Sequence, residues 1–355
     1  MIGAGVRSVR FGSMGSTGGW LAVLVWAGAT ACGSGGSAEA WVPDPFVPTA
    51  PMSALQVNGN RIVDESGATV VLRGLALADP DQVARDGHWD EHYFQQARSW
   101  GARVVRIPIH PQFWRARGPK AYVALLDQAV GWAEQRGMYV ILDWHSIGDP
   151  VAGRYQDAIY QTTQDETKAF WTTVSTRYMN DPAVAFYELW NETTNLGSST
   201  TWHDWKGLAE QLIDLVRVQR SNAIAIVGGF NWSYDLTPVG ADPVLRGNVA
   251  YSVHPYPIKR GPINTTAWGS DFGYLTATYP VFATEFGFDT DPSDTVANAT
   301  ADGYGKSITD YFASKGMSWT VWCFHPTWSP VLLKDWSYAP AEPQGTFFQT
   351  LLTNQ

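Results

Sequence analysis

The feature that most constrains the fold is a repeated alternation of short apolar runs with stretches of helical spacing. Runs rich in β-branched and aromatic residues recur between residues 71 and 322. These runs are continuous rather than alternating in polarity, which is typical of strands buried on both faces of a sheet. The alternation therefore predicts an α/β protein built on a parallel sheet.

The number of apolar runs favours a closed barrel over an open sheet. We expect strands at 71–75, 104–108, 139–142, 184–187, 223–227, 249–253, 281–283 and 319–322, and helices at 121–136, 166–179, 208–216 and 346–353. Gly-x-Gly-x-x-Gly and phosphate-loop motifs are missing from the sequence, which disfavours nucleotide binding. Residues 55–63 alternate in polarity around Asn58-Gly59 and predict a hairpin. The expected fold class is α/β, a single (β/α)8 TIM barrel with a short N-terminal β-hairpin.

The N-terminus has the pattern of an export signal. Arg7 and Arg10 precede the apolar stretch Trp20–Ala27, and Ala29-Thr30-Ala31 lies directly before Cys32. This pattern resembles a bacterial lipoprotein signal, in which the cysteine is lipidated. We therefore expect a signal peptide at 1–31, a flexible linker at 32–54 and one catalytic domain at 55–355.

Composition excludes several partners. Hydrophobic residues make up 45% of the chain and charged residues 16%, which is enough for a large core. The net charge is −9 and basic runs are lacking, so nucleic acid is a poor candidate partner. Besides Cys32 the sequence contains Cys323, so a disulfide framework is not expected.

Polar residues cluster at the predicted strand ends. In a barrel of this kind, the C-terminal strand ends meet at one mouth, where activity resides. Glu192 follows one apolar run and Glu285 follows another, and such a pair of carboxylates is the minimal machinery for cleaving a glycosidic bond. The polar residues found at these ends, in chain order, are Arg73, Arg106, Asp143 with His145, Asn191 with Glu192, His254 with Tyr256, Glu285, and then Trp322.

Taken in order, these residues lie in motifs that resemble those of glycoside hydrolase family five, which includes many cellulases. The motifs are Leu72-Arg73-Gly74, Arg106-Ile107-Pro108, Leu142-Asp143-Trp144-His145, Trp190-Asn191-Glu192, His254-Pro255-Tyr256-Pro257, Thr284-Glu285-Phe286-Gly287 and Trp322. The resemblance covers roughly residues 55–355. It implies a retaining glycosidase that forms a glycosyl-enzyme intermediate and needs no metal or other cofactor.

The resemblance also implies residue roles. Glu285 would be the nucleophile, kept ionised by Arg106 and hydrogen-bonded by Tyr256, and Glu192 would be the acid/base. Asn191 would bind the sugar 2-hydroxyl. Further substrate contacts would come from His145, His254 and Trp322, the last as a platform under the sugar.

Other positions are weaker candidates. An Arg73–Asp143 pair would support the barrel rim. The cleft would be lined by His110, Trp114, Trp144, Tyr155, Trp232 and Trp328, although each of these has an equally good interpretation as a core residue.

The preferred interpretation is an exported bacterial monomer that hydrolyses internal β-1,4 linkages of cellulose-type or mixed-linkage glucan. It would be secreted, or held at the membrane through a lipid on Cys32, with a β-linked polysaccharide as its partner. A β-mannanase, a xyloglucanase and a catalytically retired carbohydrate-binding barrel remain alternatives. His88-Trp89-Asp90-Glu91-His92 fits a zinc-peptidase pattern, but Gly87 places His88 at a helix start rather than within a helix.

Overall fold

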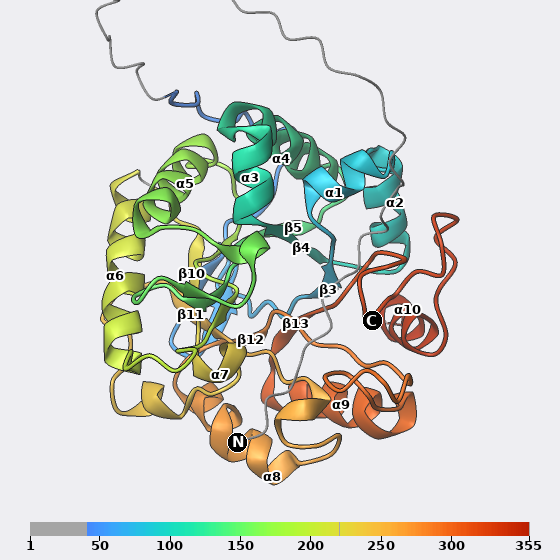
Figure 1. Ribbon diagram of the computed structural model, residues 1–355. Coiled ribbons are helices and arrows are strands. Elements are labelled where there is room, and N and C mark those ends of the chain that lie inside the picture. Colours follow the sequence, from blue (N-terminus) through green and yellow to red (C-terminus); the bar gives the residue numbers. More distant parts are fainter. Residues whose placement is uncertain (1–40, 220, 355) are drawn as a thin grey trace, which may run out of the picture. The chain divides into compact units, whose positions relative to one another are not determined.

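The computed structural model describes residues 41–219 and 221–354. The predicted signal peptide, Cys32 and the predicted linker up to residue 40 lie outside the described residues. Within the described part, eight parallel strands close into a barrel in the order β10-β11-β12-β13-β3-β4-β5-β8 (Figure 1). The predicted (β/α)8 barrel is therefore confirmed.

The barrel strands lie close to the predicted runs, and nearly all of their residues are buried. They are β3 (Arg73–Ala76), β4 (Val104–Ile109), β5 (Tyr139–Trp144), β8 (Phe186–Glu188), β10 (Ile224–Gly228), β11 (Val249–Ser252), β12 (Val281–Ala283) and β13 (Ser318–Val321). Hydrogen-bonded pairing of β13 with β3 and of β8 with β10 completes the ring. Closure of the ring brings the C-terminal ends of all these strands to one mouth.

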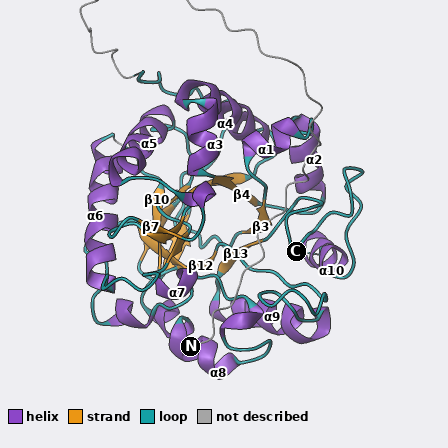
Figure 2. Cartoon of the chain, in the orientation of Figure 1, coloured by secondary structure: helices purple, strands orange, loops and turns teal. Residues whose placement is uncertain are grey.

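Helices surround the strands (Figure 2). Within the described residues they are α1 (Pro80–Arg85), α2 (Glu91–Ser99), α3 (Pro111–Arg117), α4 (Pro119–Glu134), α5 (Gln164–Arg177), α6 (Trp202–Val218), α7 (Phe230–Ser233), α8 (Thr265–Asp271), α9 (Lys306–Lys315) and α10 (Gln344–Thr353). Helix α6 begins at a capping box formed by Thr201 and Asp204. Among the described residues, helices combining the length and apolarity required to cross a bilayer are absent.

A second small sheet, not expected from the sequence, lies beside the barrel strands. It consists of β6 (Ile147–Asp149), β7 (Arg154–Tyr155) and β9 (Glu192–Thr193). Parallel pairing of β6 with β9 sets Glu192 opposite Ile147. Gly148 allows the close approach of β7, because it has a φ of +153° and an added Cβ would lie 2.2 Å from the carbonyl oxygen of Arg154. The sheet thus fixes the backbone that carries Glu192.

The hairpin predicted before the barrel is present as β1 (Gln56–Asn58) and β2 (Arg61–Val63). Residues 41–54, predicted to belong to a flexible linker, contact the domain. Arg177 donates a hydrogen bond to the carbonyl oxygen of Asp44 and lies over the ring of Phe46. Thr49 donates to Glu134 through both its amide and its hydroxyl, at 2.8 and 2.7 Å. These contacts hold the segment against α4 and α5.

Glu134, which accepts both hydrogen bonds from Thr49, also lies beside a second acid, Asp181, and this pair predicts a pH-dependent stability. Burial and hydrogen bonding to Glu134 raise the pKa of Asp181 to about 7. An unfolded aspartate loses its proton near pH 4, so the folded state loses stability as the pH rises from about 4 to 7. Asp181→Asn should abolish this loss and raise the free energy of unfolding at pH 8 by about 1–2 kcal/mol, measured by denaturant titration. The exposed-site variant Asp310→Asn should keep the wild-type slope; an equally steep slope in Asp181→Asn would contradict the assignment.

Candidate active site

Arg106 lies at the centre of the barrel mouth, on β4, and its side chain is fully buried. Its Nε donates to Glu188 at 2.6 Å, and its Nη1 donates to Glu285 at 2.8 Å. Its Nη2 lies 2.6 Å from Asn191 Oδ1 and 2.9 Å from Asp143 Oδ2. Burial disfavours the charged guanidinium, but the surrounding carboxylates outweigh it and raise the pKa of Arg106. Arg106 therefore remains a fixed positive charge to which the neighbouring acids are bound.

Glu285 lies just beyond the end of β12 and is 7% exposed. Tyr256 donates its hydroxyl proton to Glu285 Oε1 at 3.0 Å, while Arg106 occupies Oε2. Burial raises the pKa of Glu285, and His254, Arg106 and Tyr256 act in the opposite direction by favouring the carboxylate. The hydrogen bonds from Arg106 and Tyr256 orient Glu285, and the positive charge of Arg106 complements the carboxylate that a nucleophile requires.

Glu192 lies on the other side of the same mouth and is 8% exposed. Its Oε1 is 3.1 Å from Nδ1 of His254, and the other ring nitrogen of His254 is 3.0 Å from the hydroxyl of Thr284. Although burial opposes the charged form, the nearby carboxylate of Glu188, at 3.6 Å, and the hydrogen bond with Glu192 raise the pKa of His254 to about 9. The histidine thus connects Glu192 to the strand end that carries Glu285.

His145 and Trp322 form a third part of the site. The rings are parallel, with an interplanar angle of 3° and centroids 5.4 Å apart. His145 Nδ1 lies 2.6 Å from Asp143, whose carboxylate also binds Arg106. Burial and the nearby positive groups hold the pKa of His145 well below its usual range, so the ring is neutral. Trp322 donates from its indole to the carbonyl oxygen of Ser329, which fixes the ring plane.

Asn191 carries an incomplete set of hydrogen bonds. Its Oδ1 accepts from Arg106, and its backbone carbonyl accepts from Ser233 at 2.7 Å. Its buried Nδ2 has no hydrogen-bond partner among the described residues. An unsatisfied amide donor of this kind favours a ligand hydroxyl as its partner.

Three predicted positions lie elsewhere. Arg73 begins β3, at the end of the barrel opposite the mouth, and Asp143 binds Arg106 in place of Arg73. Trp114 and Trp144 are core residues that pack against Phe170 instead of lining a cleft. Helix α5, which carries Phe170, packs against both apolar rings and helps to exclude them from water.

The other weaker candidates lie nearer the mouth. His110 binds Asp79 at 2.9 Å and its ring lies 4.5 Å from that of His145, while Trp328 stacks on Trp322 at 5.9 Å. Trp232 is half-buried in α7, which follows β10, and donates to Gln156. Tyr155 is half-buried on β7, with its ring 6.3 Å from that of Trp190.

Two polar residues at the mouth were not predicted from the sequence. Glu188 ends β8 and Thr284 precedes Glu285, and they share a hydrogen bond of 2.6 Å. An acid at the end of a buried apolar run was the available signal for Glu188. Glu192 follows four residues later and is the more prominent acid, so the sequence alone does not single out Glu188.

The zinc-peptidase pattern lies in a different setting. Helix α2 begins at Glu91 with Asp90 as its cap, so His88 precedes the helix, and its ring stacks on Trp336 at 4.2 Å. His92 is exposed and lies near Gln95. Among the described residues, neither histidine belongs to a group that brings three possible metal ligands together.

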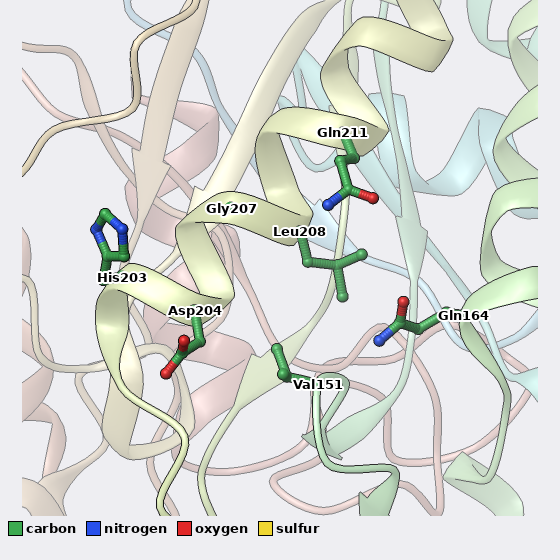
Figure 3. Close-up of a pocket in the computed structure, with 7 residues that line it drawn as sticks. All are labelled: Val151, Gln164, His203, Asp204, Gly207, Leu208 and Gln211. Atoms are coloured by element: carbon green, nitrogen blue, oxygen red, sulfur yellow. The ribbon is translucent and has the colours of Figure 1, made fainter.

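A surface depression of about 310 Å³ lies outside the mouth (Figure 3). Five of its lining residues come from α6, and the others are Val151 and Gln164. None of the predicted site residues lines it, and its lining contains no tryptophan or tyrosine on which a sugar ring could stack.

The spacing of the two glutamates identifies the class of site. Single ligand atoms of Glu192, His254 and Glu285 all lie within 4.8 Å of one another. Retaining glycoside hydrolases hold their two carboxyl groups about 5–5.5 Å apart, whereas inverting enzymes leave room for a water between them. A pair of glutamates at this spacing, at the mouth of a (β/α)8 barrel, is the arrangement of a retaining glycoside hydrolase.

The family follows from a direct match. The family model described as cellulase, glycosyl hydrolase family 5, matches residues 63–327. The chain belongs to this family, which confirms the resemblance found in the sequence.

Individual relatives agree with the family. A crystal structure of a β-glucanase from Saccharophagus degradans is 38% identical with a TM-score of 0.85, covering 89% of this chain and 98% of that one; a second, with the same values, is a complex with cellotetraose. Endoglucanase E-5 of Thermobifida fusca is 27% identical over 299 residues, which is 79% of this chain and 57% of that protein. The chain spans little more than half the length of the first curated relatives it matches.

Proposed function

We propose that this protein is a retaining endo-β-glucanase that hydrolyses internal β-1,4 linkages of glucan. The observation that carries the proposal is the spacing of Glu192 and Glu285, within 4.8 Å at their nearest ligand atoms. Family membership and the endoglucanase relatives support the same activity.

In the first step, Glu285 attacks the anomeric carbon while Glu192 protonates the leaving glycosidic oxygen. The bond to the leaving sugar breaks, and a covalent glycosyl-enzyme forms. Glu192, now a carboxylate, removes a proton from water, which attacks the same carbon and releases Glu285. Two inversions restore the β configuration.

The surrounding residues hold the sugar for these steps. The free Nδ2 of Asn191 is a donor for the sugar 2-hydroxyl, a hydrogen bond that strengthens in the transition state. Trp322, held parallel to His145, serves as the platform under the sugar at the cleavage point. The proposed chemistry uses protons and carboxylates and requires no metal or other cofactor.

Product stereochemistry tests the double displacement. Proton NMR recorded during early hydrolysis of cellotetraose should show the β anomer first, followed by slow mutarotation to the equilibrium mixture. Heat-inactivated enzyme provides the control for spontaneous change. An α anomer as the first product would exclude Glu285 as a covalent nucleophile.

The preferred polymer is cellulose-type or mixed-linkage β-glucan. A complex of the Saccharophagus degradans β-glucanase with cellotetraose supports a β-1,4-linked glucose chain as ligand. A panel of these glucans with mannan, xylan and xyloglucan, read by product size, tests this choice. Faster release from mannan or xyloglucan would reassign the substrate, and binding without cleavage would indicate a retired barrel.

The N-terminal sequence supports export from a bacterial cell, with the protein either secreted or held at the membrane through a lipid on Cys32. Mass spectrometry of the mature N-terminus distinguishes the two forms. We propose that the enzyme acts as a monomer, which size-exclusion chromatography with light scattering tests.

A further inference from the structure

Glu188 is a buried acid that the proposed mechanism leaves without a role. It ends β8 behind both reacting carboxylates, and its exposure is 0%. Its Oε2 accepts from Arg106, which also donates to Glu285. Its Oε1 accepts from Thr284 and lies 3.6 Å from His254 Nε2. Arg106 thus links Glu188 to Glu285, and His254 lies between Glu188 and Glu192.

The charge of Glu188 determines the direction of its hydrogen bonds. Burial works against ionisation, but Arg106, the nearby ring of His254 and the hydrogen bond from Thr284 lower the pKa of Glu188. An ionised carboxylate can only accept hydrogen bonds. Thr284 therefore donates its single hydroxyl proton to Glu188.

The direction of the hydrogen bond from Thr284 to Glu188 determines which nitrogen of His254 must carry a proton. Because the Thr284 proton points to Glu188, the Thr284 oxygen is free only to accept, and His254 Nε2 at 3.0 Å must carry a proton. The opposite nitrogen, Nδ1, then faces Glu192 Oε1 at 3.1 Å and can hold or release a proton there.

From this geometry we propose that Glu188 is a positioning residue that fixes the tautomer of His254 through Thr284 and so presents Nδ1 to Glu192 for proton exchange. The inference rests on the proposed function for the identity of Glu192 as acid/base. One proton is shared between Glu192 and Nδ1 of His254. When it is on Glu192, His254 is neutral with its other proton on Nε2, and Nδ1 accepts from the carboxylic acid; when it is on Nδ1, His254 is a cation that donates to the Glu192 carboxylate. Transfer of this proton to the leaving oxygen leaves Nδ1 without a proton, until Glu192 takes a new one from the attacking water and the pair shares it again. Bonds other than those to this proton are unchanged.

Several charged groups face His254, and each affects its charge. Glu188 lies on β8, Glu192 on β9 and Glu285 after β12, and all of them favour the protonated ring. Asp143, on β5, also interacts with His254, whereas the neutral ring of His145 adds no charge beside it. Removal of the Glu188 charge should therefore lower the pKa of His254, although the other acids continue to favour the protonated ring.

The test combines NMR of the His254 ring with the pH profile of kcat/KM on a soluble β-glucan. In Glu188→Gln, the titration midpoint of His254 should fall by at least about one pH unit, and the basic limb of the profile should move in the same direction. We expect kcat/KM at the optimum to fall about 10–100-fold. Glu188→Asp keeps the charge and should restore the wild-type basic limb. Glu134→Gln, which removes a buried acid remote from the mouth, should leave the profile unchanged.

A lower rate in Glu188→Gln with an unmoved His254 midpoint and an unmoved basic limb would overturn the proposal and leave Glu188 a packing role. If Glu188→Gln does not fold, Thr284→Val tests the same link, because it keeps the Glu188 charge and removes the hydroxyl. Above its titration midpoint, where the His254 ring is neutral, the nitrogen shifts of this variant should show a mixture of tautomers, and wild-type shifts there would overturn the proposal. The NMR result does not depend on turnover, so failure of the glucanase assay would reject the proposed function separately.

Discussion

Glu285→Gln is expected to lower kcat on β-glucan by at least about 10⁴-fold while leaving the fold and substrate binding nearly intact. The amide cannot attack the anomeric carbon, so the covalent step is lost. The fold should survive because Gln can rotate its oxygen towards Arg106, its amide can donate to the hydroxyl of Tyr256, and Arg106 keeps Asp143 and Glu188 as partners. Reducing-end release measures the rate, and calorimetric titration with cellotetraose measures binding.

The nucleophile role has a sharper stereochemical check. In Glu285→Ala, azide has room to attack in place of the carboxylate, and a dinitrophenyl glycoside supplies a leaving group that needs no protonation. A single displacement should then give the α-glycosyl azide. Recovery of a β-glycosyl azide, or near wild-type turnover without azide, would remove Glu285 from the nucleophile role.

Glu192→Gln should have the second-largest effect, and its size should depend on the leaving group. We expect a loss of about 10²–10⁴-fold on glucan, because the leaving sugar oxygen must be protonated, and a much smaller loss in the first step on a dinitrophenyl glycoside. The second step also lacks its base, so a burst of dinitrophenolate should precede slow turnover. Stopped-flow absorbance measures both phases.

Azide distinguishes this variant from the nucleophile variant. It attacks the glycosyl-enzyme without needing a base, so it should accelerate turnover of Glu192→Gln and give a β-glycosyl azide. Equal losses on glucan and on the dinitrophenyl substrate, with no burst, would contradict an acid/base role for Glu192.

Much of the fold was predictable because it depends on short-range patterns. Continuous apolar runs marked the barrel strands, and Glu192 and Glu285 stood out because each follows such a run. The same reasoning failed at Arg73, because β3 begins at that residue rather than ending near it. A misjudged strand boundary moved the side chain from one end of the barrel to the other.

Aromatic residues were the hardest to assign. Trp114 and Trp144 are in the core while Trp322 borders the mouth, yet all of them follow or lie within apolar segments. A tryptophan ring is suited both to core packing and to sugar stacking, so its sequence neighbours do not distinguish the two. Whether a tryptophan belongs to the core or to the mouth depends on which helices cover its ring in the folded protein.

The sequence by itself determined the order of strands and helices and the presence of an acid after two of those strands, since both follow from the polarity of nearby residues. The tertiary structure decided which of these side chains meet. Arg106 binds Glu188 and Glu285 because barrel closure brings β4, β8 and β12 to one mouth, and Glu188 lies beside His254 for the same reason. Contacts between residues so far apart in the chain depend on how the whole sheet closes, which local propensity does not specify.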